Sequence, residues 1–402
     1  MKTTSFLIEM PLAAVSLYVI GVTVYLLIVT LAAYLFRKKV DYGGRPLRLA
    51  VVIPAHNEEA HIGQTISCVQ ASSYPKGSYF VFVIADNCDD RTEEIALRAG
   101  ARVFRRTDPA RRGKGQALDW FLRGHLSAYS AADAVVMVDA DTEVHPDFLK
   151  EIAASLKHPK VHAAQGYYGV SNASAHWRSG LVSAAFHVFN HLRPAGHNCL
   201  GGTAGLRGNG MGFRKALLRH GWPAYSIVED YEFSVRLLLD GIVVHYNPDA
   251  MVFSDMPVER KVAETQRLRW EGASRQMRGT FIRLILKRLM KEPAPRYVDA
   301  LLNSFVPPLA LLVLGQSVCL GAALALQSRL AAPLACCLAV DIFYVLSGLV
   351  LRRARAVEWR SLLWAPFYVL WKIPLYIKMR KADPTVWKRT KRPSELRGGQ
   401  RS

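Results

Sequence analysis

The chain begins with a long apolar run. Residues Leu12 to Phe36 are almost wholly apolar and carry no charge, and about 20 such residues span a bilayer as a helix. Arg37, Lys38 and Lys39 follow at once, and basic residues beside a span favour the cytosolic side. A signal peptide fits badly, because its positive charge precedes a shorter apolar core. We therefore predict an N-terminal transmembrane anchor over residues 1–40, with the chain that follows in the cytosol.

Two more apolar stretches lie near the end of the chain, separated by a short link that contains Arg329. The first runs from about residue 301 to 326 and includes Pro307 and Pro308, and the second runs from about 331 to 351. Their lengths and the short link predict a helical hairpin in the membrane. The arginines that follow the second stretch indicate a return to the cytosol.

A third apolar stretch, residues 362–377, is shorter and contains two prolines and Lys372. We expect it to lie in the membrane interface or to re-enter the membrane rather than to span it. Residues 297–378 thus form the predicted C-terminal membrane region, and residues 379–402 form a basic cytosolic tail. Asp341 lies inside the second apolar stretch, where an acid either is functional or faces a partner helix.

Residues 275–291 have the pattern of an amphipathic basic helix. Apolar residues recur at helical spacing from Met277 to Leu289, and three basic residues recur four positions apart on another face. Such a helix is suited to an anionic leaflet, although an ordinary surface helix of a soluble domain has the same pattern. Its place just before the membrane hairpin favours the interface, so residues 273–296 are predicted to form an interfacial segment.

Residues 47–272, between the membrane segments, show alternating strands and helices. Pro54 is expected to end the first strand, and the first helix is expected to start near Glu58 and Glu59. The alternation indicates an α/β domain with a mostly parallel sheet covered on both faces. Ligands of such sheets bind at the carboxyl ends of the strands. Four short apolar runs are the predicted strands: 49–53, 80–84, 102–104 and 134–138.

Charge and cysteine content narrow the class of partner. The 402 residues carry a formal net charge of +20, which suits nucleic acid, an anionic membrane or a phosphorylated substrate. Many basic residues flank the apolar segments or lie in the C-terminal tail, so the membrane is favoured, and no nucleic-acid-binding motif is present.

The six cysteines form no CxxC pair, which is typical of reduced thiols in a protein that faces the cytosol.

Acidic residues follow two of the predicted strands. Asp139 and Asp141 come directly after the run 134–138, and Asp86 follows the run 80–84. Two carboxylates with one residue between them suit Mg²⁺ or Mn²⁺, which bind few protein carboxylates and complete their shell with phosphate oxygens. Either cluster alone is also compatible with a solvated turn that caps a helix, but their shared position at strand ends favours a binding site.

Three further motifs carry charge suited to chemistry. The loop 111–115 is basic and contains glycine, so its amides and Lys114 are suited to a diphosphate, although it lacks the full P-loop pattern. Glu229 and Asp230 precede a predicted helix, where a carboxylate acts as a general base or only interacts with the helix dipole. Residues 266–270 contain two arginines and a tryptophan. The guanidinium groups suit a phosphate, and the indole suits stacking with a sugar or base ring.

With these motifs in order, the chain resembles the membrane-integral family 2 glycosyltransferases, which include cellulose, hyaluronan and chitin synthases, bacterial exopolysaccharide transferases and ceramide glucosyltransferase. The resemblance covers about three quarters of the chain and implies a GT-A type nucleotide-sugar-binding domain between N-terminal and C-terminal transmembrane helices. Val228 replaces the threonine of the family's TED motif. The residues that match the family's donor-binding motifs are Pro54, His56, Glu58, Asp86, Lys114, Asp139, Gln266, Arg269 and Trp270.

The resemblance also implies a role for each motif. Asp86 matches the acid that contacts uracil, and Lys114 a lysine near the diphosphate. Asp139 and Asp141 match the metal-binding DxD, with Asp141 favoured as the ligand of Mg²⁺ or Mn²⁺. Asp230 matches the catalytic base. The Gly-rich residues 201–210 resemble the acceptor-side strand and loop, and residues 387–390 resemble the family's C-terminal W-x-x-T segment, although a basic tail looks similar.

These roles imply an inverting hexosyltransferase. It takes a sugar from a nucleotide-sugar, by analogy a UDP-sugar, for exopolysaccharide or envelope glycan biosynthesis. Transfer of one sugar to a lipid-linked acceptor is favoured slightly over processive polysaccharide synthesis, because the hairpin is small for a channel unless the chain forms a homo-oligomer. The expected location is the inner or plasma membrane, in contact with lipids and with the catalytic domain cytoplasmic. The alternative of another class is a non-catalytic nucleotide-binding scaffold, which the intact acids argue against.

Overall fold

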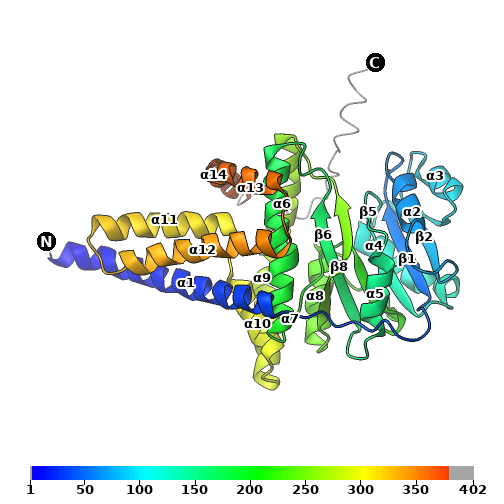
Figure 1. The fold of residues 1–402 in the computed structure, drawn as a ribbon, viewed down its shortest axis with the longest axis horizontal. Coiled ribbons are helices and arrows are strands. Elements are labelled where there is room, and N and C mark those ends of the chain that lie inside the picture. Colours follow the sequence, from blue (N-terminus) through cyan, green and yellow to red (C-terminus); the bar gives the residue numbers. More distant parts are fainter. Residues whose placement is uncertain (1, 380–402) are drawn as a thin grey trace, which may run out of the picture.

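The structure, a computed structural model, describes residues 2–379. It leaves out the side chains of residues 2–9, of several positions between 260 and 276, and of 375 and 377–379. The segment expected to resemble the W-x-x-T motif, residues 387–390, therefore lies outside the described residues. Three long helices project from one side of a sheet-containing domain, and upright helices lie between the two parts (Figure 1).

The domain of residues 47–272 is built on one sheet of eight strands in the order β3-β2-β1-β4-β7-β6-β8-β5. Strands β3, β2, β1 and β4 pair in parallel, β6 pairs in parallel with β8, and the remaining pairings are antiparallel. The mostly parallel sheet expected from the alternating pattern is confirmed for its first half. The strands are β1 (Leu49–Ala55), β2 (Tyr79–Asp86), β3 (Arg102–Arg106), β4 (Ala134–Met137), β5 (Glu143–Val144), β6 (Ala163–Val170), β7 (Met211–Arg214) and β8 (Val244–Ser254).

Alternate residues of the central strands enter two separate cores. Leu49, Val51 and Ile53 of β1 lie in a core with three helices on one face of the sheet, α2 (Ile62–Gln70), α3 (Thr92–Arg98) and α5 (Phe148–Lys157). Ala50 and Val52 lie in the other core with α4 (Lys114–Gly124) and α8 (Glu229–Leu239). This period of two is what a strand buried on both faces requires.

Two details of the predicted elements are wrong. Strand β1 continues through Pro54 to Ala55, although Pro54 was expected to end it. Strand β4 pairs with β1 only as far as Val52, so beyond that point β1 has one paired neighbour and tolerates the missing N–H of a proline. Helix α2 begins at Ile62, four residues after the expected start at Glu58.

The second core extends from the sheet into the projecting helices. Val22, Leu26 and Val29 of α1 (Lys2–Leu35) belong to the same cluster of buried residues as the sheet. Residues 177–199 form one continuous helical run of α6 (Trp177–His187), a π-helical turn (Val188–Leu192) and α7 (Arg193–Cys199), and α1 packs along α7. Helix α1 is therefore joined to the sheet domain by apolar packing as well as by the chain.

Substitution of Gly196 by alanine tests this joint. A Cβ atom at Gly196 would lie 2.2 Å from the carbonyl oxygen of Val29, so α7 and α1 must move apart. We expect the substitution to lower the free energy of unfolding by about 1–3 kcal/mol, the usual effect of overpacking, measured by thermal unfolding in detergent. Gly21→Ala on α1 is the matched control, because its Cβ meets nothing within 4 Å. An unchanged melting temperature for Gly196→Ala would contradict the close packing.

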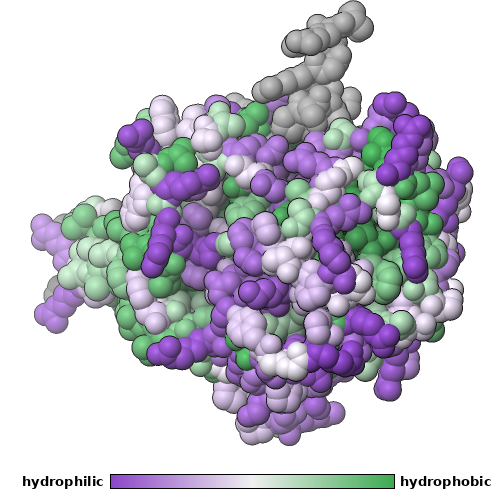
Figure 2. Space-filling model, turned by 45° about the vertical axis from the view of Figure 1, so that its right-hand side comes forward, coloured by the Kyte–Doolittle hydropathy of each residue, from purple (hydrophilic) through white to green (hydrophobic). Residues whose placement is uncertain are grey.

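Among residues 2–379, two helices are long and apolar enough to cross a membrane, Met10–Leu35 within α1 and α12 (Ala331–Leu351). The stretch expected at 301–326 consists of two helices, α10 (Pro295–Phe305) and α11 (Leu309–Ala325), bent by 64° at Pro307 and Pro308. Helices α11 and α12 pack together as the expected hairpin and also pack on α1. The projecting part is largely apolar on its surface, whereas the sheet domain is mostly hydrophilic (Figure 2).

Buried polar groups connect these apolar helices. Gln316 of α11 donates to the hydroxyl of Thr23 on α1 at 2.9 Å, and neither side chain is more than 2% exposed. Asp341 of α12 is also 2% exposed, so it faces the interior of the helix bundle. The last helical segments described are α13 (Ala356–Ser361), a 3-10 turn (Leu362–Trp364) and α14 (Ala365–Met379), and the short third stretch expected at 362–377 falls on the turn and α14.

Helix α9 (Arg260–Lys291) differs from the expected interfacial helix in length and in the use of its apolar face. The expected boundary between residues 272 and 273 falls inside it. Phe281 and Ile285 are buried: Phe281 contacts Tyr231 of α8, and Ile285 lies in a cluster with Leu238 and Tyr297. Part of the face that was expected to meet lipid is thus packed against α8 and α10, whereas Leu284 of the same face is exposed, as are Leu286 and Met290.

Candidate active site

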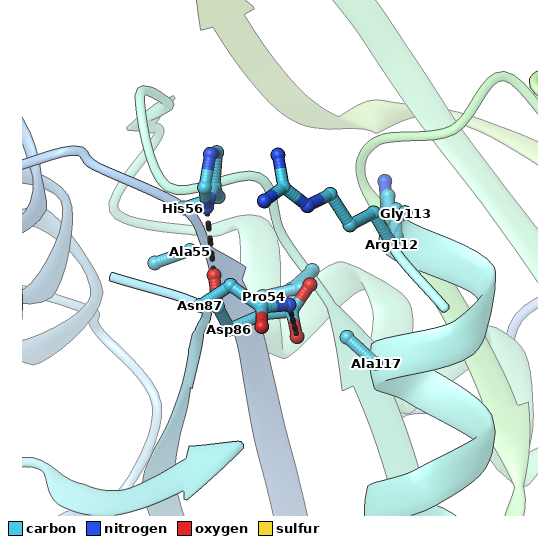
Figure 3. A pocket seen from close by; sticks show the side chains of 9 residues that line it. Pro54, Ala55, His56, Asp86, Asn87, Arg112, Gly113 and Ala117 are labelled. Atoms are coloured by element: carbon cyan, nitrogen blue, oxygen red, sulfur yellow. Dashed lines mark hydrogen bonds between the residues drawn. The ribbon is translucent and has the colours of Figure 1, made fainter. Parts of the chain in front are cut away.

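A pocket lies at the carboxyl ends of β1 and β2 and opens beside the start of α4 (Figure 3). Its volume is about 130 Å³. Four of the residues expected to bind the donor line it together, namely Pro54, His56, Asp86 and Lys114. The other lining residues are Ala55, Asn87, Arg112, Gly113 and Ala117. Residues separated by sixty positions in the sequence meet here because parallel strands end on the same edge of the sheet.

The floor of the pocket is a buried ion pair. Asp86 is 5% exposed, and its carboxylate accepts a hydrogen bond of 2.5 Å from Nη1 of Arg106 and one of 2.9 Å from Asn87. Burial raises the pKa of Asp86, and the Arg106 guanidinium opposes this shift. The backbone oxygen of Asp86 also lies 2.7 Å from Nδ1 of His56. Asp86 is therefore held in a fixed position at the end of β2.

Arg106, which the sequence analysis did not identify as a site residue, also holds the loop of residues 107–113 in place. Its Nη2 donates to the backbone oxygen of Arg111 at 2.7 Å and to the carboxylate of Asp108 at 3.2 Å. The loop that holds Arg112 and Gly113 is thus tied to the same guanidinium as Asp86. The only sequence signal was a basic residue at the end of a predicted strand, which is common on protein surfaces.

Arg106→Met should destabilise the domain and weaken nucleotide binding. The substitution leaves the carboxylate of Asp86 buried without its partner, and breaking a buried ion pair on one side costs about 3–5 kcal/mol. We expect a lower melting temperature and a weaker affinity for UDP, measured by thermal unfolding and calorimetry. Arg105→Met is the matched control, because this neighbouring residue is exposed. Equal melting temperatures for the two variants would contradict a structural role for the pair.

Beside the pocket, Lys114 connects the acidic motifs. Its Nζ donates to the carboxylate of Asp139 and to the backbone oxygen of Gly208, and it lies 3.9 Å from the carboxylate of Glu229. Burial lowers the pKa of Lys114, but the Asp139, Glu229 and Asp230 carboxylates outweigh burial and raise it. Lys114 is therefore a cation at neutral pH, placed among three acids.

Asp230 adjoins this group from the first turn of α8. Gly208 has φ of +78°, and a Cβ atom there would lie 3.2 Å from Oδ2 of Asp230 and 4.0 Å from Nζ of Lys114. Burial raises the pKa of both Glu229 and Asp230, and the cation of Lys114 opposes the shift. A raised pKa makes a carboxylate a stronger base.

The turn that carries the two metal-binding candidates is held from both sides. The backbone N–H of Asp139 donates to Oδ1 of the fully buried Asn209 at 3.1 Å, and the amide of Asn209 donates to Thr142 at 2.8 Å. The hydroxyl of Thr65 donates to the backbone oxygen of Ala140 at 2.9 Å. Asn209 lies in the Gly-rich stretch, but its link to the acids was not foreseen.

Carboxylates on such a turn fit a divalent cation. The side chain of Asp139 is 32% exposed and that of Asp141 is partly exposed. An ion from solvent can therefore reach the carboxylate oxygens of both residues. Among the described residues, no group of three or more His, Cys, Asp or Glu side chains is placed to hold a metal. Two carboxylates on one turn suit Mg²⁺ or Mn²⁺, because these hard ions bind one or two carboxylates and take their other ligands from water and phosphate.

The remaining expected residues lie elsewhere. Glu58 is outside the lining of the pocket, and its backbone N–H donates to Thr92 at 2.7 Å. Gln266, Arg269 and Trp270 lie on α9. Gln266 does not line the pocket, and the side chains of Arg269 and Trp270 are outside the described residues.

The comparisons with known proteins agree with this geometry. The sequence profile of the family described as "Glycosyltransferase like family 2" matches residues 46–273, which is more than half of the chain. The protein belongs to this family of glycosyltransferases. The matched range covers the eight-stranded sheet and every expected site residue.

Known relatives include enzymes that make glycolipids and enzymes that make glycans. The chain is 30% identical over 239 residues to "Beta-monoglucosyldiacylglycerol synthase" of Trichormus variabilis, covering 56% of this chain and 49% of the relative. It is 25% identical over 262 residues to "N-acetylglucosaminyltransferase" of Rhizobium meliloti, covering 61% of this chain and 59% of the relative. The chain spans about half the length of the curated relatives it matches.

A solved structure confirms the GT-A type fold that was expected. The mannosyltransferase PcManGT of Pyrobaculum calidifontis, solved in complex with GDP-Man and Mn²⁺, superposes with a TM-score of 0.55 at 18% identity. The likeness covers 84% of this chain and 98% of that one. At this identity the similarity concerns the fold alone.

Proposed function

We propose that this protein is an inverting glycosyltransferase that moves one sugar from a UDP-sugar to a lipid-linked acceptor at the cytosolic face of the membrane. The observation that carries the proposal is the position of Lys114. It contacts Asp139 of the metal-binding candidates, lines the pocket that contains Asp86, and adjoins Asp230. A donor site and a candidate base are therefore within one cluster of side chains.

In this mechanism the acceptor hydroxyl attacks the anomeric carbon of the donor. A bond forms between the acceptor oxygen and that carbon, the bond to the diphosphate oxygen breaks, and the nucleoside diphosphate leaves with the electron pair. Asp230 takes the proton of the hydroxyl. Lys114, together with Arg269 on α9, offsets the negative charge that develops on the diphosphate.

Asp139 and Asp141 are the residues that would hold Mg²⁺ or Mn²⁺. When bound, the ion supplies Lewis-acid stabilisation of the diphosphate. Asp86 would bind the base and His56 would help to position it, since both line the pocket and the His56 ring contacts the backbone oxygen of Asp86. A one-step displacement inverts the configuration, so an α-linked donor gives a β-linked product.

The membrane location is the other part of the proposal. Helices α1 and α12 are long and apolar enough to cross a membrane, and the basic residues after α1 favour a cytosolic catalytic domain. We place the protein in the inner or plasma membrane as a multi-pass protein with α10 and α11 entering as a bent pair. An acceptor anchored in the same membrane then approaches Asp230 from the side of these helices.

A product analysis tests the proposed function. The purified protein in lipid nanodiscs would receive Mn²⁺, a panel of radiolabelled sugar nucleotides and an extract of candidate lipid acceptors. We expect label in a product that organic solvent extracts. Label in a product of high molecular weight would show a processive synthase instead. No transfer and no hydrolysis with any donor would contradict the enzyme assignment.

A further inference from the structure

Two arginines lie on the membrane side of Asp230. Arg193 is at the start of α7, and Arg207 is in the Gly-rich loop before β7. Both approach Phe189: Nη2 of Arg207 donates to its backbone oxygen at 3.2 Å, and the guanidinium of Arg193 lies 5.5 Å from the centre of its ring. No ion pair of either arginine is found within the part of the chain that the structure describes.

The site of Arg207 is electrostatically unusual. Burial lowers the pKa of Arg207 to about 10, the guanidinium of Arg193 lowers it as well, and the carboxylate of Asp230 opposes both effects. The Nε of Arg207 is buried and has no hydrogen-bond acceptor among the described residues. A buried donor without an acceptor costs about 1–3 kcal/mol, and two neighbouring like charges add to this cost. Both costs disappear when an anion binds.

The membrane helices add a third donor to the same place. Tyr344 of α12 is 1% exposed, lies in the core that also holds Leu192 and Leu206, and is near enough to influence the pKa of Arg207. Its hydroxyl has no partner within the described residues. The guanidinium of Arg193 also donates to the side-chain oxygen of Asn303 on α10. Arg207 of the sheet domain and Tyr344 of α12 thus each have a buried donor without an acceptor among the described residues, and Arg193 joins the same region to α10.

We propose that Arg193, Arg207 and Tyr344 bind the phosphate group of the acceptor, and that the acceptor is therefore a phosphate-bearing lipid rather than a neutral one. Guanidinium groups match phosphate oxygens in a bidentate geometry, and a tyrosine hydroxyl adds a neutral donor. The site lies between the candidate base and the helices that enter the membrane. A lipid headgroup held there has its acyl chains on the membrane side and its reactive oxygen near Asp230. This inference rests on the proposed function.

Binding of purified lipids tests the site without a requirement for turnover. The protein in maltoside micelles, which contain no phosphate, would be offered phosphatidylglycerol, a polyprenyl phosphate or diacylglycerol, and retained lipid measured by native mass spectrometry. We expect one or both phosphate lipids to bind more tightly than diacylglycerol. Tighter binding of phosphatidylglycerol would indicate that the site takes a phosphate that links two groups, and tighter binding of the polyprenyl phosphate would indicate a terminal phosphate. Arg193→Gln and Arg207→Gln should each weaken binding by about tenfold, as expected for a charge-assisted contact.

Further variants separate a binding role from a structural one. Arg193→Lys and Arg207→Lys keep the charge and should recover part of the affinity, and Tyr344→Phe should weaken it a few-fold, as for one neutral hydrogen bond. Arg219→Gln, at an exposed arginine of the same domain, is the matched control and should bind as the wild type does. Equal retention by the wild type and both glutamine variants, or a preference for diacylglycerol, would overturn the proposal.

The two proposals fail separately. A wild type that binds the phosphate lipids selectively but neither transfers nor hydrolyses any sugar nucleotide would refute the enzyme assignment and keep the lipid site. A wild type that transfers sugar to diacylglycerol, with the same KM in Arg193→Gln and Arg207→Gln, would keep the enzyme assignment and refute the lipid site.

Discussion

Asp230→Asn should abolish sugar transfer while donor binding persists. A positioned general base contributes about 10²–10⁴-fold to a rate, and asparagine keeps the shape of the side chain without its basicity. Burial raises the pKa of Asp230, while the backbone N–H of Tyr231 and the cations of Lys114 and Arg207 limit the shift. The raised pKa makes this carboxylate more basic than that of an exposed aspartate, as a base for a hydroxyl requires.

Single-turnover transfer assays and calorimetric binding of UDP would measure the two effects separately. Asp240→Asn is the matched control, because Asp240 caps the other end of α8 and is exposed. We expect it to transfer sugar at the wild-type rate. Full transfer by Asp230→Asn would remove this residue from the mechanism, and loss of UDP binding would show that the substitution disturbs the donor site instead.

Asp141→Asn should lower transfer by roughly a hundredfold or more at a moderate concentration of Mn²⁺, since a Lewis acid contributes several kcal/mol to such a step. The variant loses one of the two carboxylates on the turn that Asn209 and Thr65 hold in place. Treatment of the wild type with a chelator should have the same effect, and Mn²⁺ or Mg²⁺ should reverse it. A higher concentration of Mn²⁺ should recover part of the activity of the variant.

The comparison uses transfer rates over a titration of Mn²⁺. Glu143→Gln is the matched control, because Glu143 is an exposed acid two residues beyond Asp141, and its dependence on Mn²⁺ should equal that of the wild type. If chelator-treated wild-type protein keeps its full rate, the reaction does not depend on a metal and the role of the Asp139–Asp141 turn is wrong.

The sequence predicted those parts of the fold that a single segment determines. Apolar runs of about 20 residues indicate α1 and α12, and short β-branched runs indicate β1, β2 and β4. The antiparallel strands β6 and β7 were not predicted. Strand β6 contains two glycines, and β7 has only four residues, so neighbouring strands rather than intrinsic propensity define them.

The residues of the candidate site, like the elements of the fold, were predictable only where a local sequence pattern marks them. Asp86, Asp139 and Lys114 follow strand ends or open a helix, so their positions were predictable once the strands were known. Arg106 and Asn209 act through partners twenty and seventy residues away, and such pairs leave no local pattern. The burial of Phe281 and Ile285 of α9 against other helices was not predicted for a related reason: amphipathicity shows that a face is covered but does not show whether protein or lipid covers it.

The packing of α1 has a consequence for biosynthesis. This helix leaves the ribosome before its partners α7, α11 and α12, which follow more than 150 residues later, and the Thr23–Gln316 hydrogen bond joins residues 293 positions apart. In the proposed membrane location, helix α1 must therefore stay in the bilayer without these partners while the whole sheet domain is made and folds beside it. Because contacts between distant segments form slowly, assembly of this membrane bundle is a late step, and a chain truncated before α12 leaves the polar face of the first helix exposed to lipid.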